Sequence, residues 1–492
     1  MMLNQAAPEC ASRLLSFVNA SPTPFHATFN AAQRLESVGF KKVPDLPLRN
    51  WTPGTRRSKL VENTTLRGMF LSKLNIRHSL IPLRNQSTLL AFTLPQAWKH
   101  GTGLNIVATH IDSPNLRVRP ISKREKAGYL QVAVETYGGG LWHTWFDRDL
   151  SLAGRVITAN RSGDFTSRLV KIDRPILRIP NLAIHRNRGS ADNFQFNQET
   201  EFVPVLGLIS SQLNATENKP AEKEKKEIQA SSIENNHHSA LLSLLANELS
   251  VAPDEIHDFE LHLYDTNPAT IGGINNEFIF SPRMDNQFSS FCAVDALAQS
   301  VSSSQHPLPE GNVNVIALFN HEEIGSVSTT GAESNLIPSL LSRLSPTPET
   351  LAQSISRSFL LSCDMGHAVH PNYIAKHEEN HKPFMNGGMI IKTNAKQRYT
   401  SDAIGSFIVK KLIEKKGGKV QEFEVRNDMA CGSTVGPHLS TIGMRTVDVG
   451  APMLSMHSIR ETAGSGDVQN CIDLFASLFE SFSDLDSKLV VE

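Results

Sequence analysis

Short apolar runs that end in polar or charged residues recur along the chain. Residues 313–319 contain no Gly or Pro and lead to the adjacent Glu322 and Glu323, and residues 104–112 close on His110 and Asp112. Uninterrupted apolar runs of this length are typical of strands buried on both faces of a sheet. Three further runs of this kind end at a charged residue: Asp285, Asp364 and Lys392.

Between these runs, apolar residues spaced three or four positions apart predict helices. One face of the expected helix 24–37 is lined by Phe25, Phe29, Ala32 and Leu35, and one face of the helix 402–416, which Asp402 can cap, by Ile404, Phe407, Ile408 and Leu412. Further helices are expected at 7–19, 239–249, 288–300 and 467–482. Alternating strands and helices predict an α/β fold with a largely parallel or mixed sheet, whose sites lie at the carboxyl ends of its strands.

From about residue 113 the sequence pattern changes. Short β-rich segments at 130–136, 155–158 and 168–172 follow, separated by turn residues. We therefore expect a β-rich domain (113–258) inserted into an α/β domain made of residues 1–112 and 259–492. Within the insert, residues 214–238 are highly charged and nearly devoid of large apolar side chains, which predicts a mobile loop.

Composition narrows the function classes. Lys plus Arg (48) nearly balances Asp plus Glu (49), so no global field favours nucleic acid or an anionic membrane. Five scattered cysteines without CxxC spacing favour a reducing compartment and argue against a thiolate zinc site. With no leader-like start and no apolar run of membrane-spanning length, a cytoplasmic protein is expected, while vacuolar delivery stays open. Gly138–Gly140 lacks the GxGxxG spacing of a nucleotide-binding turn.

Six polar residues are expected to meet at the carboxyl edge of the sheet: His110, Asp285, Glu322, Glu323, Asp364 and His457. Taken singly, the Glu pair also fits a solvated loop, and His110 a structural histidine. Together, two imidazoles and three carboxylates suit two divalent ions that share one carboxylate; zinc fits best, with manganese or cobalt as alternatives. The ions carry four positive charges against three negative ones, which leaves about one positive charge to hold a hydroxide.

Two further roles follow from spacing. On an extended chain Asp112 lies on the same face as His110, so it can bond the ring nitrogen that does not face a metal. Glu322 and Glu323 would point to opposite sides, so one can bind a metal while the other, Glu322, takes the proton of a reacting water. Metal-assisted hydrolysis of an acyl bond is the expected chemistry.

The same segments resemble a known family, the aspartyl aminopeptidases or M18 metallopeptidases. The resemblance is carried by His-Ile-Asp-Ser-Pro at 110–114, Ser-Pro-Arg-Met-Asp-Asn at 281–286, Asn-His-Glu-Glu-Ile-Gly-Ser at 320–326, Asp-Met-Gly-His-Ala-Val-His-Pro-Asn at 364–372, Asn-Asp-Met-Ala-Cys-Gly-Ser-Thr-Val-Gly-Pro at 427–437 and Met-His-Ser-Ile-Arg-Glu at 456–461. It runs from about residue 14 to 482, and only the charged loop falls outside it.

The resemblance implies a di-zinc exopeptidase domain and a β-rich dimerisation domain that assemble into a tetrahedral dodecamer acting on peptides. His110 and Asp364 would hold one zinc, Glu323 and His457 the other, and Asp285 would bridge them. It further implies Glu322 as general base, Asp112 as the residue that orients His110, and His185 as a group that reaches a neighbouring subunit's site and helps stabilise the transition state there.

Substrate choice rests on Lys392, which occupies the family's position for binding an acidic N-terminal residue, although a Lys extending from a strand end to solvent is the plain alternative. Removal of N-terminal Asp or Glu from peptides is the main hypothesis. The alternatives are an aminopeptidase of neutral, Leu-type preference or a deacylase on the same scaffold, and a catalytically silent oligomer that serves as scaffold or cargo.

Overall fold

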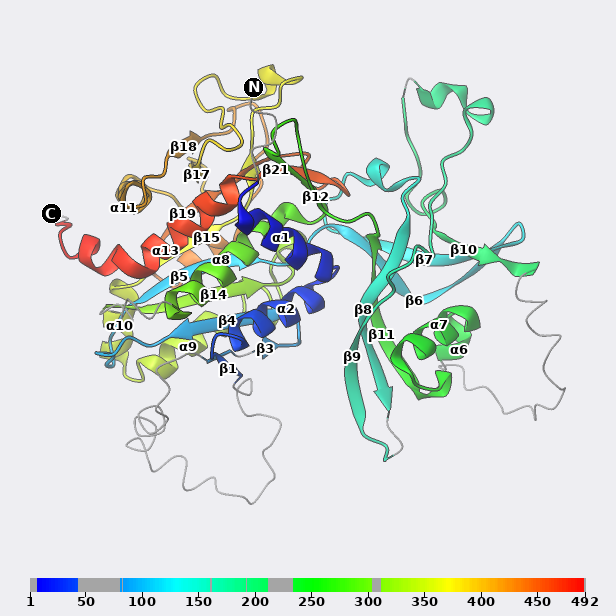
Figure 1. The fold of residues 1–492 in the computed structure, drawn as a ribbon, viewed down its shortest axis with the longest axis horizontal. Coiled ribbons are helices and arrows are strands. Elements are labelled where there is room, and N and C mark those ends of the chain that lie inside the picture. Colours follow the sequence, from blue (N-terminus) through cyan, green and yellow to red (C-terminus); the bar gives the residue numbers. More distant parts are fainter. Residues whose placement is uncertain are drawn as a thin grey trace.

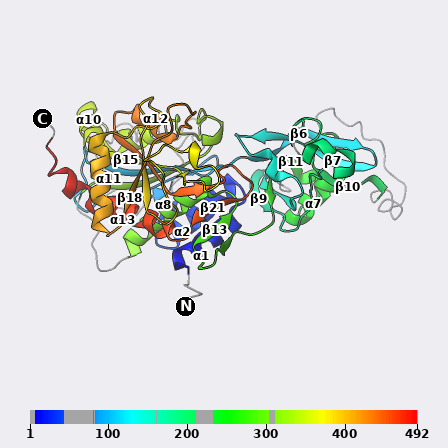
Figure 2. The same cartoon turned by 90° about the horizontal axis from the view of Figure 1, so that it is seen from above.

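Two lobes lie side by side in the computed structural model, each built on its own sheet (Figure 1, Figure 2). The structure describes residues 7–42, 80–81, 83–159, 162–191, 193–210, 233–302 and 311–490. Among these residues, no helix combines the length and apolar character needed to cross a bilayer. The predicted fold class, a mixed sheet flanked by helices with a β-rich insert, is confirmed.

The larger lobe contains a ten-stranded mixed sheet. Its order is β1 (Lys41–Lys42), β2 (Leu80–Ile81), β4 (Thr88–Thr93), β14 (Val313–Phe319), β5 (Leu104–His110), β15 (Phe359–Cys363), β19 (Arg445–Gly450), β17 (Met389–Lys392) and β18 (Val420–Phe423), with β3 (Leu83–Arg84) paired to β4. Strands β14, β5, β15 and β19 run parallel to one another. Their carboxyl ends therefore meet at one edge of the sheet.

Both faces of this sheet are covered, which explains the uninterrupted apolar strands. In β14, Ile316 and Leu318 face one core while Val315 and Ala317 face the other. The first core is completed by α1 (Glu9–Ala20), α2 (Pro24–Glu36), α8 (Met284–Ser302), α11 (Ala403–Lys415) and α13 (Asp467–Asp486). The second is completed by α9 (Leu336–Leu344) and α12 (Val435–Ser440), with α10 (Pro348–Ser356) packed at its margin.

Two of the expected helix faces are partly wrong. Phe29 of α2 is 44% exposed, and Ile404 and Phe407 of α11 are 37% and 42% exposed. In α11 the buried stripe is centred between Ile408 and Val409, because Leu412 and Ile413 are buried with them. At 3.6 residues per turn, that stripe leaves Ile404 at its margin and Phe407 on the opposite side of the helix. The expected cap holds, since the Asp402 side chain accepts a hydrogen bond from the Gly405 N–H at 2.6 Å.

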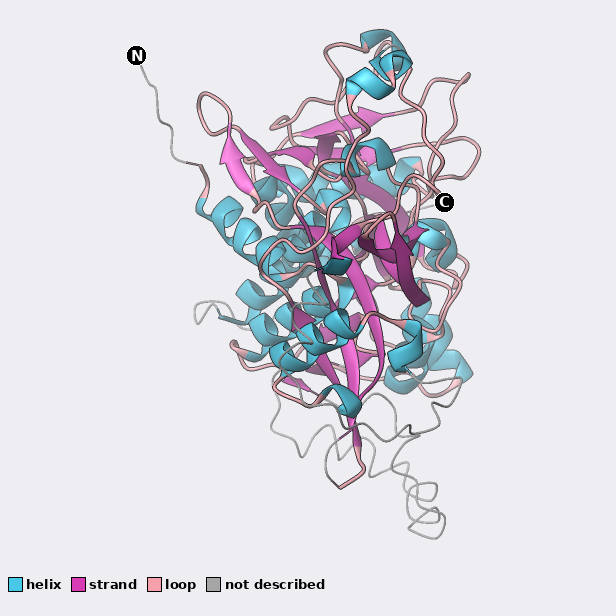
Figure 3. Ribbon diagram, turned by 90° about the vertical axis from the view of Figure 1, so that its right-hand side faces the viewer, coloured by secondary structure: helices cyan, strands magenta, loops and turns pink. Residues whose placement is uncertain are grey.

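The smaller lobe is a six-stranded antiparallel sheet backed by α7 (Ser239–Leu249). Its order is β10 (Val205–Leu208), β7 (Tyr129–Tyr137), β6 (Asn115–Lys126), β11 (Ile256–Asp265), β8 (Leu150–Ala159) and β9 (Phe165–Lys171). Since β11 pairs with β8 along its whole length, the expected domain boundary at 258/259 is wrong and falls inside this sheet. Figure 3 views the molecule from the side of this lobe.

The expected mobile loop at 214–238 divides into two parts. Residues 214–232 lie outside the described residues. Residues 233–238 do not form a loop, because α6 (Ile233–Asn236) leads directly to the buried His237 and His238. The His237 ring shares a hydrogen bond of 2.8 Å with Ser122 Oγ. Apolar packing of α7 against the sheet holds this end of the segment in place.

A small third sheet was not expected from the sequence. It joins β12 (Thr270–Gly272), β13 (Phe278–Ser281), β21 (Glu461–Gly464), β20 (Pro452–Leu454) and β16 (Gly366–His367). Strands of two to four residues are too short to display a period of two. This sheet ties together the segments that follow β15 and β19 and the segment that precedes α8.

Candidate metal centre

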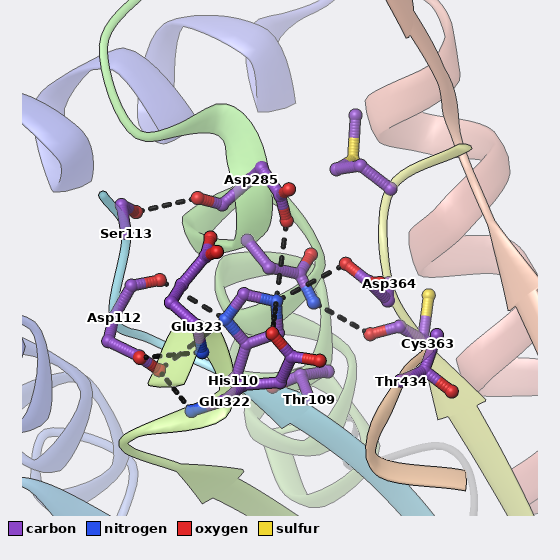
Figure 4. Close-up of polar contacts among 12 residues, drawn as sticks. Thr109, His110, Asp112, Ser113, Asp285, Glu322, Glu323, Cys363, Asp364 and Thr434 are labelled. Carbon is purple, nitrogen blue, oxygen red and sulfur yellow. Dashed lines mark hydrogen bonds and ion pairs between the residues drawn. The ribbon is translucent and has the colours of Figure 1, made fainter. Parts of the chain in front are cut away.

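The carboxyl ends of three adjacent parallel strands supply most of the site (Figure 4). His110 is the last residue of β5, and Asp364 follows β15 directly. After β14 the chain forms the short 3-10 turn η5 (Glu322–Ile324). Asp285 comes from the first turn of α8, where its backbone departs from helical geometry. Residues far apart in the sequence therefore converge at the sheet edge.

Two overlapping groups of side chains are spaced to hold a metal ion each. The first is His110, Asp285 and Asp364, and the second is Asp285, Glu323 and His457; within each, the ligand atoms lie within 4.8 Å of one another. The two oxygens of Asp285 divide between them. Oδ1 lies 3.3 Å from His110 Nε2 and Oδ2 lies 3.3 Å from His457 Nε2. Asp285 thus has the geometry of a shared carboxylate.

Glu322 differs from these residues in position. It forms a third candidate group with His110 and Glu323. Its carboxylate is 4.0 Å from His110 Nε2, however, whereas Asp285 and Asp364 both approach that nitrogen to 3.3 Å. The Glu322 side chain is also 17% exposed, against 5% for Glu323. Glu322 therefore lies beside the two groups that share Asp285 and is more exposed than Glu323.

The two histidine rings are held so that Nε2 faces the carboxylates. His110 Nδ1 lies 3.1 Å from the main-chain carbonyl oxygen of Asp112 and 3.5 Å from its carboxylate. His457 Nδ1 lies 2.8 Å from the carbonyl oxygen of Gly139. A carbonyl oxygen accepts a hydrogen bond from Nδ1–H, which leaves Nε2 free to bind a metal.

Asp112 does more than the sequence predicts. Its carboxylate accepts hydrogen bonds from the main-chain N–H groups of Glu322 and Glu323, both at 3.2 Å, and from the hydroxyl of Tyr137 at 2.7 Å. Burial acts to raise the pKa of Asp112, but His110 and these donors hold that pKa below its ordinary value. Asp112 therefore anchors the turn that carries both glutamates as well as standing behind His110.

The glutamate pair is not on an extended segment, so the expected alternation of its side chains is wrong. His321 adopts the left-handed conformation with φ 66°, and the chain then turns through η5. This turn is what aims two successive N–H groups at the carboxylate of Asp112 (Figure 4). The two side chains differ in depth instead, since Glu322 is 17% exposed and Glu323 is 5% exposed.

Burial and mutual interaction shift the pKa values of the clustered carboxylates and imidazoles. Burial, with neighbouring carboxylates, raises the pKa of Glu322 to about 8 and that of Glu323 well above its ordinary value. Burial alone would lower the pKa of His110, but Glu322 and the three aspartates around it raise that pKa instead. Among the described residues, Asp285 Oδ1 and Glu323 Oε1 are buried without a hydrogen-bond partner. Imidazole and carboxylate donors with spare oxygens fit two divalent ions of the zinc type.

Glu461 is a site residue that sequence reasoning did not single out. It is buried, and its two oxygens accept hydrogen bonds from the main-chain N–H groups of His457 at 2.7 Å and of Asp285 at 3.2 Å. Burial and the charge of Asp285 raise the pKa of Glu461 to about 8. Its place four positions after His457 in the same motif was the available signal.

Lys392 and His185 occupy very different surroundings. Lys392 is 1% exposed; its Nζ donates to the carbonyl oxygen of Met365 at 2.8 Å and lies 3.5 Å from Asp364 Oδ2. A Lys that extends to solvent is therefore excluded. His185 lies on the exposed turn η2 (Ile184–Arg186) of the smaller lobe. No hydrogen bond or ion pair within the described part of the chain joins it to the metal centre.

Comparison with known proteins places this site in a family. Residues 71–479 match the model of the Aminopeptidase I zinc metalloprotease (M18) family. The chain is 44% identical to aspartyl aminopeptidase 1 of Schizosaccharomyces pombe, with 100% of this chain and 98% of that protein covered. It is 43% identical to aspartyl aminopeptidase of Aspergillus oryzae, with 97% of each chain covered.

Solved structures agree. The cryo-EM structure of a complex of Ape4 with Nbr1 matches with a TM-score of 0.88 and 44% identity, covering 100% of this chain and 90% of that one. The structure of the mApe1 dodecamer of Saccharomyces cerevisiae matches with a TM-score of 0.78 and 27% identity, covering 98% of this chain and 99% of that one. With its cluster of imidazoles and carboxylates, the chain therefore belongs to the M18 family of zinc metalloproteases and is an aminopeptidase.

Proposed function

We propose that this aminopeptidase binds two zinc ions and removes N-terminal Asp or Glu from peptides. The observation that carries the proposal is the pair of three-residue groups that share Asp285. Each group offers one imidazole and two carboxylates, a donor set suited to zinc. The proposed ligands are His110, Asp285 and Asp364 for one ion and Asp285, Glu323 and His457 for the other.

Bound divalent ions polarise the scissile carbonyl and make the attacking water more acidic. Glu322 is the proposed general base, because it stands beside the two ligand groups and belongs to neither of them. Its carboxylate accepts a proton from the attacking water and donates it to the leaving amine. The main-chain N–H of Glu322 donates a hydrogen bond to Asp112 at 3.2 Å. This bond fixes the main chain of Glu322 and so helps to hold the Glu322 carboxylate in place during the proton transfer.

An acidic substrate residue needs a cation near the metal centre, and we assign this role to Lys392. Its ammonium lies 3.5 Å from Asp364 Oδ2, next to the proposed ligands. Several relatives over the whole chain are named aspartyl aminopeptidases. An ammonium next to the proposed ligands would attract the side-chain carboxylate of an acidic first residue.

One observation favours neutral substrates as a second candidate. The Lys392 ammonium already donates to the carbonyl oxygen of Met365 and lies beside Asp364. A cation whose charge is partly compensated within the protein attracts a substrate carboxylate less strongly. A neutral-preferring aminopeptidase would use Lys392 to position Asp364 instead.

We further propose that the chain is a homo-oligomer, with the tetrahedral dodecamer as its form, and that it acts in the cytoplasm. A related structure is described as a dodecamer. Within such an assembly, His185 would reach the metal centre of a neighbouring subunit. Its exposed position on the smaller lobe, away from the centre of its own chain, supports this.

A dipeptide panel tests the proposal. The protein is incubated with Asp-, Glu-, Leu- and Lys-terminal dipeptides, with and without a chelator, and its metal content is measured. Release of Asp and Glu that the chelator abolishes and zinc restores supports the main proposal. Faster release of Leu selects the neutral alternative. If protein that carries two ions per chain releases no residue from any dipeptide, the result supports the catalytically silent oligomer that serves as scaffold or cargo.

A further inference from the structure

Gly138–Gly140, which does not have the spacing of a nucleotide-binding turn, lies against the metal centre. The segment leaves the end of β7 in the smaller lobe, just after Tyr137. Its neighbours include Glu323 and His457, which belong to the same proposed metal group. A segment of the inserted domain therefore contacts one half of the centre directly.

Gly138 is fitted to Glu323. It adopts φ +76°, a conformation that favours glycine, and a Cβ added there would lie 3.1 Å from Glu323 Cβ and 3.4 Å from the Glu323 carbonyl oxygen. These distances are tighter than ordinary contact, so any side chain at this position would push on Glu323. The absence of a side chain lets the segment support Glu323 from close range.

The next residues hold His457. The carbonyl oxygen of Gly139 accepts the hydrogen bond from His457 Nδ1 at 2.8 Å, and the N–H of Leu141 donates to the His457 carbonyl oxygen at 2.9 Å. His457 itself has φ 66°, an uncommon conformation for a residue with a side chain. Its main chain and its ring are thus both fixed by residues 139–141.

The residue that precedes the glycines reaches the same group by another route. The Tyr137 hydroxyl donates to Asp112 Oδ2 at 2.7 Å, and the same oxygen accepts the main-chain N–H of Glu323 at 3.2 Å. Tyr137 is buried, so its hydroxyl is committed to this contact. Three consecutive parts of one segment therefore converge on Glu323 and His457.

We propose that residues 137–141 form a positioning strap that sets the affinity of the ion held by Asp285, Glu323 and His457. This inference rests on the proposed metal ligands. Residues 138–141 contact Glu323 and His457 directly, and Tyr137 bonds the Asp112 oxygen that accepts the Glu323 N–H. The His110 ring is held by Asp112 and lies 3.3 Å from Asp364, and residues 138–141 do not bond to either His110 or Asp364 in the described part of the chain. Disturbing the strap should therefore weaken one ion more than the other, and the inserted domain is part of the metal centre.

The test is metal retention in Gly138→Ala. A matched control is Gly128→Ala, because Gly128 has φ +85° but would place nothing within 4 Å of a new Cβ. Both variants carry the same kind of backbone strain, and only Gly138→Ala presses on Glu323. Zinc-loaded proteins are dialysed against increasing chelator concentrations, and zinc per chain is measured, with circular dichroism and particle size to check folding.

Each of the two ions should leave Gly128→Ala at about the same chelator concentration as it leaves the wild type. Gly138→Ala should release one ion at a chelator concentration about 10- to 100-fold lower, as expected when the support of a ligand is lost. Tyr137→Phe, which removes only the hydroxyl bonded to Asp112, should weaken zinc retention by about tenfold. Equal retention in all four proteins, or equal loss in Gly128→Ala and Gly138→Ala, would overturn the strap. A folded wild type that never holds two ions would overturn the proposed function itself.

Discussion

At the scale of single residues, the two adjacent glutamates present the sharpest contrast. Glu323 is nearly buried and belongs to the group around Asp285 and His457, whereas Glu322 is more exposed and lies 4.0 Å from the nearest imidazole. Glu322→Gln should lower turnover by about 10²- to 10⁴-fold, the usual contribution of a general base, while zinc content stays at the wild-type value. Steady-state kinetics and metal analysis measure the two effects.

The matched variant is Glu323→Gln, which should lose zinc as well as activity because it removes a proposed ligand. The opposite pattern, with metal lost from Glu322→Gln and kept by Glu323→Gln, would show that the two roles are exchanged. The 3.2 Å hydrogen bonds from both N–H groups to Asp112 do not depend on either side chain. The turn itself should therefore survive both substitutions.

Lys392 gives the second residue-scale prediction. Lys392→Met keeps the length of the side chain and removes its charge, so hydrolysis of Asp- and Glu-terminal dipeptides should fall about 10- to 100-fold in kcat/KM, as for loss of a charged hydrogen bond. Leu-terminal dipeptides should be affected much less. Because Nζ lies 3.5 Å from Asp364, zinc content must be measured in the same preparation. Equal losses on all substrates at full zinc content would remove Lys392 from substrate recognition.

Removal of metal should make stability fall with rising pH. In the metal-free protein burial raises the pKa of Glu322 and of Glu461 to about 8, from ordinary values of 4.5. Between those values the folded chain binds more protons than the unfolded chain, so stability decreases as pH rises, by up to about 1.4 kcal/mol per pH unit for each group. The pKa of Asp285 is lowered well below its ordinary value of 3.8. This group makes stability rise with pH, but only in acidic solution below its ordinary pKa.

Thermal unfolding of chelator-treated protein between about pH 6 and pH 8 measures this slope. The apparent melting temperature should drop with pH, and it should drop less in Glu322→Gln, which lacks one titrating group. Zinc-loaded protein should show a flatter profile, since bound cations keep the carboxylates ionised. A metal-free melting temperature that rises over this range would contradict the assignment.

At the scale of elements, α11 provides a direct test of which helix face is buried. Leu412 is fully buried whereas Phe407 is 42% exposed. Leu412→Ala should cost about 2–5 kcal/mol of unfolding free energy. Phe407→Ala should cost only about 0.5 kcal/mol. Denaturant unfolding followed by fluorescence compares the two, and equal costs would mean that Phe407 packs against a neighbouring surface.

Elements with strong local signals could be predicted from the sequence, and those defined by tertiary contacts could not. β14 and α7 have the expected bounds, because an apolar run or a helical period specifies them locally. β11 reads as a strand too, but only its pairing with β8 reveals to which sheet it belongs. The same limit applies to the strands of the third sheet, which contain only two to four residues each.

The metal centre likewise combines features that the sequence predicts with features that only tertiary contacts determine. Strand-end positions bring His110 and Asp364 together, so topology alone predicts their meeting. The turn at Glu322 depends on the left-handed His321 and on Asp112, and Tyr137 arrives from the other lobe. Such contacts have no periodic signature along the chain.

At the scale of the whole molecule, the smaller lobe lies beside the larger one (Figure 1), and its turn η2 has no buried residue. Leu182 and Ile184, which flank His185 closely, are 60% and 50% exposed. Exposed apolar side chains mark a contact with another chain where they form a contiguous patch. If this surface meets a neighbouring subunit, the active site is shared between chains.

Subunit complementation distinguishes a shared site from a self-contained one. His185→Ala and Glu322→Gln should each be nearly inactive as pure oligomers. Coexpressed in equal amounts, they should recover activity, because random assembly pairs an intact Glu322 with a neighbour's intact His185 at roughly one site in four. Coexpressed Glu322→Gln and Glu323→Gln should recover none, since both defects then lie in the metal centre of each chain. If the His185→Ala mixture also fails to recover while particle size is unchanged, His185 acts within its own chain, whereas a fully active pure His185→Ala oligomer would place it outside catalysis.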